Sequence, residues 1–253
     1  MVDDIAERLA RSLPASGGPR PPAGPAVDHL ARWLAVRETV AWQEASNRGG
    51  EGPVTPARDG AAEDIRAFDR ALDPARAEGL LAALERLRAD AAHGTPLDFA
   101  LLRGWQQHVL GTARPPEFRT LPAFAKRGRE RYGIAPDTRA RLDACLAESA
   151  ESAGRADSAG SGEDAGAPLP LTVRAARAYL DVCFFHPFDD GNARSAFLAL
   201  VFVLAREGVT LDSVSLLRRV TLQADSAQDA LSLANYVDVH LAETRRRAAA
   251  PAS

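Results

Sequence analysis

Apolar residues recur at every third or fourth position along most of this 253-residue chain, and no segment shows the alternation typical of a half-buried strand. Between residues 27 and 46, for example, Leu30, Trp33 and Leu34 share one helical face. The spacing predicts helices over 1–13, 27–46, 61–72, 74–92, 97–110, 136–149, 171–184, 192–207 and 226–247. We therefore expect an all-α fold.

Two of the segments between the expected helices have a distinctive composition. Prolines and glycines break up residues 112–134, which we interpret as a long loop or a short hairpin. Residues 151–168 are rich in Ser, Gly, Ala and acidic residues, and this composition is typical of a flexible loop. The helices after that loop are too few to form a core of their own. We expect an N-terminal helical extension over 1–94, packed on a main domain over 95–253.

Composition excludes several classes of protein. The formal net charge is −3 and the pI is near 6.0, which gives no reason to expect a nucleic-acid-binding protein. The longest apolar run, 196–205, is about half of what a membrane span needs, and the acidic N-terminus lacks the apolar segment of a signal peptide. The two cysteines, Cys145 and Cys183, are expected to be buried thiols in a reducing compartment. A cytoplasmic location with no membrane partner is the resulting expectation.

Polar residues that are suited to chemistry lie between two apolar helices, in the segment 185–194. Burying polar groups there would cost several kcal/mol unless they have partners. Gly191 followed by Asn192 at a helix start leaves backbone N–H groups free, with the positive end of the helix dipole behind them. Arg194 follows within one helical turn. Together these features predict an anion site.

Two further groups lie just before that helix start. Asp190, with its neighbour Asp189, offers a carboxylate that could hold a divalent cation against bound phosphates. The imidazole of His186 could accept a proton from an incoming hydroxyl. Taken singly, a histidine at a helix end or an Asp-Asp-Gly-Asn turn is more often a capping or packing element than a site.

The order of these residues resembles a known motif. The stretch from His186 to Arg194, His-Pro-Phe-Asp-Asp-Gly-Asn-Ala-Arg, is similar to the Fic family motif His-Pro-Phe-x-Asp/Glu-Gly-Asn-Gly-Arg-x-x-Arg. A looser similarity extends over residues 95–245. The resemblance implies a Fic-like helical bundle with a short flap, a hairpin or loop, near residues 118–134. It also implies that the residues from His186 to Arg194 act as one site.

The resemblance assigns a role to each matching residue. His186 would be the general base, Phe188 the anchor of the loop in the core, and Asp190 the ligand of Mg²⁺. The nucleotide would be bound by Gly191, Asn192, Ala193 and Arg194. The flap that aligns the target backbone would contain Thr120, Leu121 and Lys126.

These roles imply an enzyme similar to protein adenylyltransferases. It would use a Mg²⁺-bound nucleotide, ATP or another, and move AMP or another phosphate-containing group onto a Ser, Thr or Tyr hydroxyl of a protein. The alternative is a catalytically weak Fic-like fold that serves as a nucleotide-binding or protein-interaction module.

Two positions depart from the motif. Ala193 replaces the second glycine, which would cost on the order of 1 kcal/mol if that backbone needs a positive φ. Phe197 replaces the final arginine, so a triphosphate would lose a charge-assisted partner worth roughly 1.5–3 kcal/mol. Because Phe197 continues an apolar face with Leu200 and Val201, we expect it to be buried and to face away from the pocket. Glu44 lies where some Fic relatives carry an inhibitory glutamate, but its spacing from Thr39 is one residue too long. An ordinary amphipathic helix ending at Asn47 is favoured there.

Overall fold

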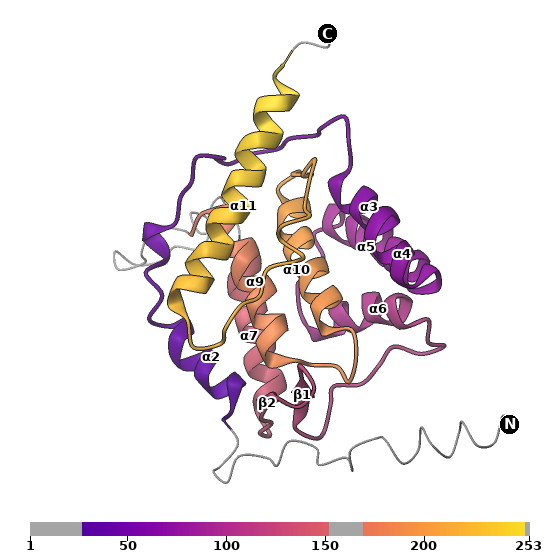
Figure 1. Cartoon of the computed structure of the whole chain (residues 1–253), viewed down its shortest axis with the longest axis vertical. Coiled ribbons are helices and arrows are strands. Elements are labelled where there is room, and N and C mark those ends of the chain that lie inside the picture. Colours follow the sequence, from indigo (N-terminus) through magenta and orange to yellow (C-terminus); the bar gives the residue numbers. More distant parts are fainter. Residues whose placement is uncertain (1–26, 152–168, 251–253) are drawn as a thin grey trace, which may run out of the picture.

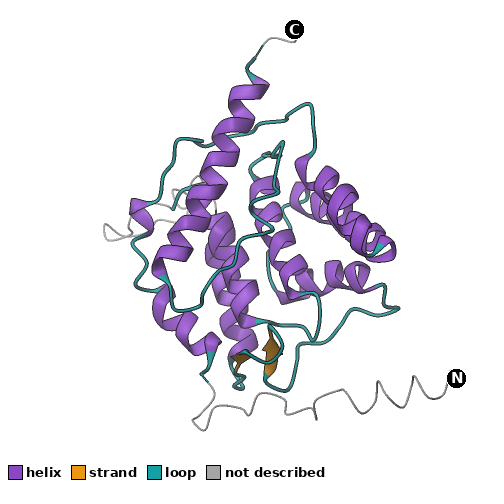
Figure 2. Ribbon diagram, viewed as in Figure 1, coloured by secondary structure: helices purple, strands orange, loops and turns teal. Residues whose placement is uncertain are grey.

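The computed structural model describes residues 27–151 and 169–250, and helices dominate them (Figure 2). The helix expected over 1–13 and all but the first residue of the 151–168 loop lie outside the described residues. The helices are α2 (His29–Arg37), α3 (Gly60–Asp64), α4 (Arg70–Leu72), α5 (Pro74–Ala92), α6 (Phe99–Leu110), α7 (Thr138–Ala150), α9 (Leu171–Phe185), α10 (Asn192–Arg206) and α11 (Ala227–Ala248). Two shorter turns complete them, η1 (Trp42–Glu44), a 3₁₀ helix, and η2 (Ile65–Asp69), a π-helical turn between α3 and α4. The expectation of a mostly helical fold is confirmed.

Helices α9 and α10 lie side by side at the centre of the molecule (Figure 1). Helix α10 is buried on every face, because every side chain from Ser195 to Leu204 is inside the core. Helices α7 and α11 pack against α9, and α5 and α6 pack against α10. The loop 186–191, which connects the central pair, is therefore held on both sides by buried helices. Among the described helices, none has the length and hydropathy needed to cross a membrane.

Helix α5 belongs by sequence to the expected N-terminal extension. It packs against α6 and α10, and its apolar residues are part of the same core as theirs. Whether residues 1–94 form a separable unit stays a prediction.

A small hairpin lies beside the loop between α9 and α10. Strands β1 (Ala123–Ala125) and β2 (Glu130–Tyr132) pair antiparallel, with Ala123 opposite Tyr132. The turn between them contains three residues of positive φ, Lys126, Arg127 and Gly128. Of the two forms expected for 112–134, the structure has the short hairpin.

The helix expected over 27–46 is shorter than predicted. Helix α2 ends at Arg37, and the chain then makes the 3₁₀ turn η1. Thr39 explains the end, because both its amide and its hydroxyl bond to the Val36 carbonyl, at 2.8 and 2.9 Å. The apolar spacing continues to residue 41, but it follows a turn and not a helix.

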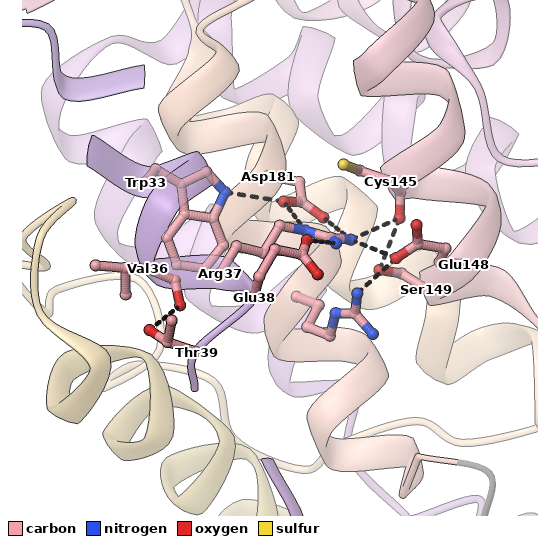
Figure 3. Close-up of polar contacts among 10 residues, drawn as sticks. Trp33, Val36, Arg37, Glu38, Thr39, Cys145, Glu148, Ser149 and Asp181 are labelled. Carbon is pink, nitrogen blue, oxygen red and sulfur yellow. Dashed lines mark hydrogen bonds and ion pairs between the residues drawn. The ribbon is translucent and has the colours of Figure 1, made fainter. Parts of the chain in front are cut away.

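A buried ion pair fastens α2 to the central helices (Figure 3). The guanidinium of Arg37 donates from Nε to Asp181 Oδ1 on α9 at 2.9 Å and from a terminal nitrogen to Glu148 on α7 at 2.9 Å. Trp33 Nε1 donates to the same Asp181 oxygen at 2.9 Å. Arg37 and Asp181 are almost fully buried, so each charge depends on the other for compensation.

Candidate active site

The loop between α9 and α10 begins with a backbone change at His186. Helix α9 ends at Phe185, and His186 adopts a left-handed conformation with φ 50° and ψ 56°. Its N–H still bonds to the Val182 carbonyl at 3.1 Å, so the turn is tied to the helix that precedes it. Helix α10 begins at Asn192, as expected. A non-glycine residue with this φ costs about 1–2 kcal/mol, which the surrounding contacts must offset.

The ring of His186 is held in one orientation. Its Nδ1 lies 3.2 Å from the Cys183 carbonyl oxygen, which accepts a hydrogen bond and so assigns the proton to Nδ1. Tyr132 of the hairpin stacks on the imidazole, with ring centroids 4.4 Å apart and planes within 7°. The opposite nitrogen, Nε2, is then the basic atom of the neutral ring.

The surroundings of His186 also favour the neutral form. Burial lowers the pKa of His186, and the nearby charge of Arg119 acts in the same direction. The Cys183 carbonyl and Glu130 oppose this change without reversing it. An imidazole with a lowered pKa is unprotonated at neutral pH and available as a base.

Arg119 joins the hairpin to the histidine. Its side chain donates to the carbonyl oxygens of His186 at 2.8 Å, Phe185 at 3.1 Å, Leu121 at 2.7 Å and Gly133 at 2.5 Å. The residue is buried, and burial lowers the pKa of its guanidinium. The sequence gives no sign of this role for Arg119, because its four acceptors are backbone atoms that no side-chain pattern reveals.

The second half of the loop is closed by Asn192. Its side-chain amide accepts from the Phe188 N–H at 2.9 Å and donates to the Phe188 carbonyl at 2.7 Å. The Phe188 ring is fully buried and lies 5.4 Å from the ring of Phe99. Both ends of the Asn192 side-chain amide therefore hold the shape of the loop, and its backbone N–H remains to meet an anion.

Gly191 occupies a position that another residue could not take without strain. Its φ is +78°, and a Cβ there would lie 2.5 Å from Nε2 of Gln106. Gln106 holds the loop from α6 by donating to the Asp190 carbonyl at 2.6 Å. The conformation favours glycine here, and a Cβ would also press on the Gln106 amide that holds the loop.

The start of α10 carries free donors. No side chain caps the helix, and the Gly191 carbonyl accepts hydrogen bonds from the N–H groups of Arg194 and Ser195. The N–H groups of Asn192 and Ala193 come earlier and have no acceptor among the described residues. Ala193 is exposed and has an ordinary helical backbone, so the strain considered for it does not arise.

These groups open onto one cavity of about 440 Å³, a size that suits a small molecule. Its walls come from the loop, from the start of α10, from the hairpin and from the segment 68–72. They include Phe68, Asp69, Leu72, Phe124, His186, Asp189, Asp190, Gly191, Asn192, Ala193, Arg194, Phe197 and Arg218. The proposed base and the free helix N-terminus therefore face the same space.

The expectation that Phe197 faces away from the pocket is wrong. Phe197 is buried, with 1% of its surface exposed, but it lines this cavity and does not face away from it. The guanidinium of Arg218 lies over its ring, 4.8 Å from the centroid. The apolar spacing could not show this, because α10 is apolar on all sides and every face looks like a core face.

Asp190, the expected Mg²⁺ ligand, lies at the cavity wall. One carboxylate oxygen accepts from the Gly191 N–H at 2.7 Å, and the other lies 2.9 Å from Arg76 of α5. Among the described residues no group of three or more His, Cys, Asp and Glu side chains could hold a metal. This donor set fits Mg²⁺ bound mainly by phosphate and water with one or two carboxylates, and it does not fit a site built from protein alone.

The expected flap residues lie on and around the hairpin. Thr120 and Leu121 are exposed, and Lys126 forms an ion pair with Glu130 at 2.6 Å. Strand β1 pairs only with β2 among the described strands, so its other edge is free. The exposed ring of Phe124 lines the cavity beside that edge.

Glu44 lies outside this group. It belongs to the turn η1, its side chain is exposed, and it does not line the cavity.

The site thus combines a neutral imidazole and an uncapped helix start in one cavity of a mostly helical protein. Residues 96–204 match the model of the Fic/DOC family. This match confirms, over these residues, the resemblance to the Fic/DOC family that the motif predicted.

Three solved structures are similar to this chain. A Fic domain-containing signaling protein from Bacteroides thetaiotaomicron is 20% identical and superposes with a TM-score of 0.50, over 87% of this chain and 88% of that one. Fic-1 from C. elegans is 15% identical over 97% of this chain and 73% of its own, with a TM-score of 0.48. IbpAFic2 in complex with adenylylated Cdc42 is 15% identical over 87% and 71%, with a TM-score of 0.47. No curated protein matches the chain.

Proposed function

We propose that this protein transfers AMP, or another phosphate-containing group, from a Mg²⁺-bound nucleotide onto a Ser, Thr or Tyr hydroxyl of a target protein. The observation that carries the proposal is the shared cavity. His186 is oriented with Nε2 as its basic atom, and the free N–H groups at the start of α10 line the same wall as Arg194. A base and an anion site in one cavity are what phosphoryl-group transfer to a hydroxyl requires.

Proton removal and phosphate binding are carried out by different groups in this cavity. The target hydroxyl loses its proton to His186 as its oxygen attacks the phosphorus of the donor. A new P–O bond forms to the target, and the bond to the leaving phosphate breaks. For AMP transfer from ATP, the leaving group is pyrophosphate. The N–H groups of Asn192 and Ala193 and the guanidinium of Arg194 hold the negative charge on the phosphate oxygens.

Mg²⁺ fits this site as a companion of the phosphates. Asp190, with Asp189 beside it on the cavity wall, would hold the ion. When bound, Mg²⁺ would neutralise part of the phosphate charge. Before it binds, Asp190 has to exchange its contact with Arg76, which is a partly exposed ion pair of little stability.

The hairpin supports a protein as the acceptor. The free edge of β1 offers unpaired backbone groups next to the cavity, and an extended segment of a target could pair with them. The exposed side chains of Leu121 and Phe124 would contact that segment. In this role Thr120, Leu121 and Lys126 belong to the part of the protein that aligns the target.

The alternative is a module that binds a nucleotide or a protein without transfer. The loss of the second motif arginine favours this alternative. The fixed orientation of the His186 ring favours the enzyme. A structural histidine would not require the stacked Tyr132 and the four-carbonyl contact of Arg119.

A nucleotide panel tests the proposal. The purified protein is incubated with Mg²⁺ and ATP, GTP, CTP or UTP, with and without a cell extract, and labelled proteins are detected by intact and peptide mass. We expect a mass increase of one nucleotide monophosphate on a Ser, Thr or Tyr with one of them. Calorimetric titration runs in parallel. Binding without any transfer would support the alternative, and neither binding nor transfer would contradict both.

A further inference from the structure

A second arginine reaches the cavity from outside the motif. Arg218 lies in the segment between α10 and α11, next to Leu217, which is fully buried. Its side chain is only 9% exposed, yet it lines the same cavity as Arg194. Desolvating a cation costs energy unless it has anionic partners, and Arg218 has two, Asp64 and Asp69.

Asp69 shows that the two arginines converge. One of its carboxylate oxygens lies 3.7 Å from Nε of Arg194, and the other lies 2.6 Å from a terminal nitrogen of Arg218. Two guanidinium groups that reach one carboxylate are close enough to meet neighbouring phosphates of one chain.

Arg218 is held in place by contacts that do not use all of its donors. Its guanidinium lies over the Phe197 ring, and a terminal nitrogen donates to Asp64 at 2.6 Å. Asp64 and Asp69 each engage one terminal nitrogen, while a guanidinium carries five N–H groups. Donors therefore remain for a ligand.

Arg218 lies beside α10, and its place along that helix suggests which phosphate it would bind. The free N–H groups are at the first turn of the helix, with Arg194 beside them. Phe197 is one turn further along the same face, since it follows Arg194 by three residues. Arg218, which lies over the Phe197 ring, is thus further along α10 than the free N–H groups, on a wall of the same cavity that a longer phosphate chain could reach.

We propose that Arg218 binds the phosphates of the donor beyond the one held at the helix start, and so selects a di- or triphosphate over a monophosphate. This rests on the proposed function. Phe197 is then the platform for a cation that comes from another part of the chain. The motif position of the final arginine is therefore more than a core position, because Phe197 supports Arg218 there.

Arg219 offers a matched control. It also pairs with Asp64, at 2.9 Å, and its guanidinium also lies over an aromatic ring, that of Phe68 at 4.3 Å. It differs in being more exposed and in not lining the cavity. Replacing it perturbs the same carboxylate and leaves the proposed contact intact.

The test compares Mg²⁺-bound ATP and AMP by calorimetric titration, with inorganic tripolyphosphate and phosphate as probes that carry no base. For Arg218→Gln we expect the dissociation constants of ATP and tripolyphosphate to rise roughly 10- to 100-fold, the range for a lost charge-assisted hydrogen bond. Those of AMP and phosphate should change less than about 3-fold. Arg219→Gln should change all four by less than about 3-fold.

Thermal unfolding of each variant checks that the fold survives. If Arg218→Gln does not fold, Arg218→Lys keeps the charge beside both carboxylates but lacks the planar fork, and it should show a smaller loss for ATP alone. Equal loss for ATP and AMP, or no loss in a folded Arg218 variant, would overturn the role of Arg218. A wild-type protein that binds none of the probes would instead contradict the proposed function, and this inference with it.

Discussion

Replacing Arg119 by alanine removes the contact that joins the hairpin to His186. Each hydrogen bond from a charged donor contributes roughly 1.5–3 kcal/mol, and Arg119 makes four of them to carbonyl oxygens. Burying a guanidinium without a carboxylate partner costs several kcal/mol and offsets much of that sum. We expect a net loss of about 3–5 kcal/mol in the free energy of unfolding, a large part of the stability of a typical domain.

Urea denaturation followed by circular dichroism measures this loss. Arg114→Ala is the control, because Arg114 is exposed and changes the charge of the same segment. It should change the free energy of unfolding by less than about 0.5 kcal/mol. Arg119→Lys should lie between the two, since an ammonium has three N–H donors and cannot bond to four carbonyls as the guanidinium does. A loss below about 1 kcal/mol for Arg119→Ala would mean that the four hydrogen bonds do not hold the loop, and this reasoning would be wrong.

Three other predictions concern the loop and its neighbours. Tyr132→Ala should lower kcat at least about ten-fold with little change in nucleotide affinity, measured by titration, whereas Tyr132→Phe keeps the stacked ring and should stay within about 3-fold of wild type. The rate of transfer should rise with pH through a midpoint below the ordinary histidine value of about 6.5, because burial lowers the pKa of His186 and the protonated ring cannot act as a base; a midpoint above 7 in the pH profile of kcat/KM would contradict this. Ala193→Gly should not increase activity and should destabilise the protein by about 0.5–1 kcal/mol in thermal unfolding, since residue 193 has a helical backbone; a clear gain in activity would show that the alanine impairs the site.

The local part of the site could be predicted from the sequence. His186, Gly191 and Arg194 lie within nine residues of each other, and the ends of two strongly periodic helices enclose them. A glycine between such helices signals a turn of positive φ, and the structure has one at Gly191. The fold class could be predicted in the same way, from the helical periodicity of the apolar residues. Most of the helices begin and end within a few residues of the expected bounds.

The contacts that complete the site join segments far apart in the chain. Tyr132 reaches His186 from the hairpin, Arg119 reaches it from the segment before the hairpin, and Arg218 reaches the cavity from beyond α10. No spacing in a single sequence records such contacts, since they depend on how the helices pack. Phe197 shows the limit most clearly, because its apolar neighbours gave no sign that one of its faces would support a cation.

The central claim is that His186 acts as the base and does not bind the nucleotide. The most direct measurement compares transfer and binding in His186→Asn, because asparagine tolerates the left-handed backbone of this position and cannot accept the proton. We expect transfer, measured by mass shift, to fall by at least about 10²-fold, while the dissociation constant of the Mg²⁺-bound nucleotide changes less than about 3-fold. Arg194→Ala should instead weaken binding itself, by about 1.5–3 kcal/mol. Transfer that persists in the histidine variant, or a loss of binding equal to that of the arginine variant, would contradict the account.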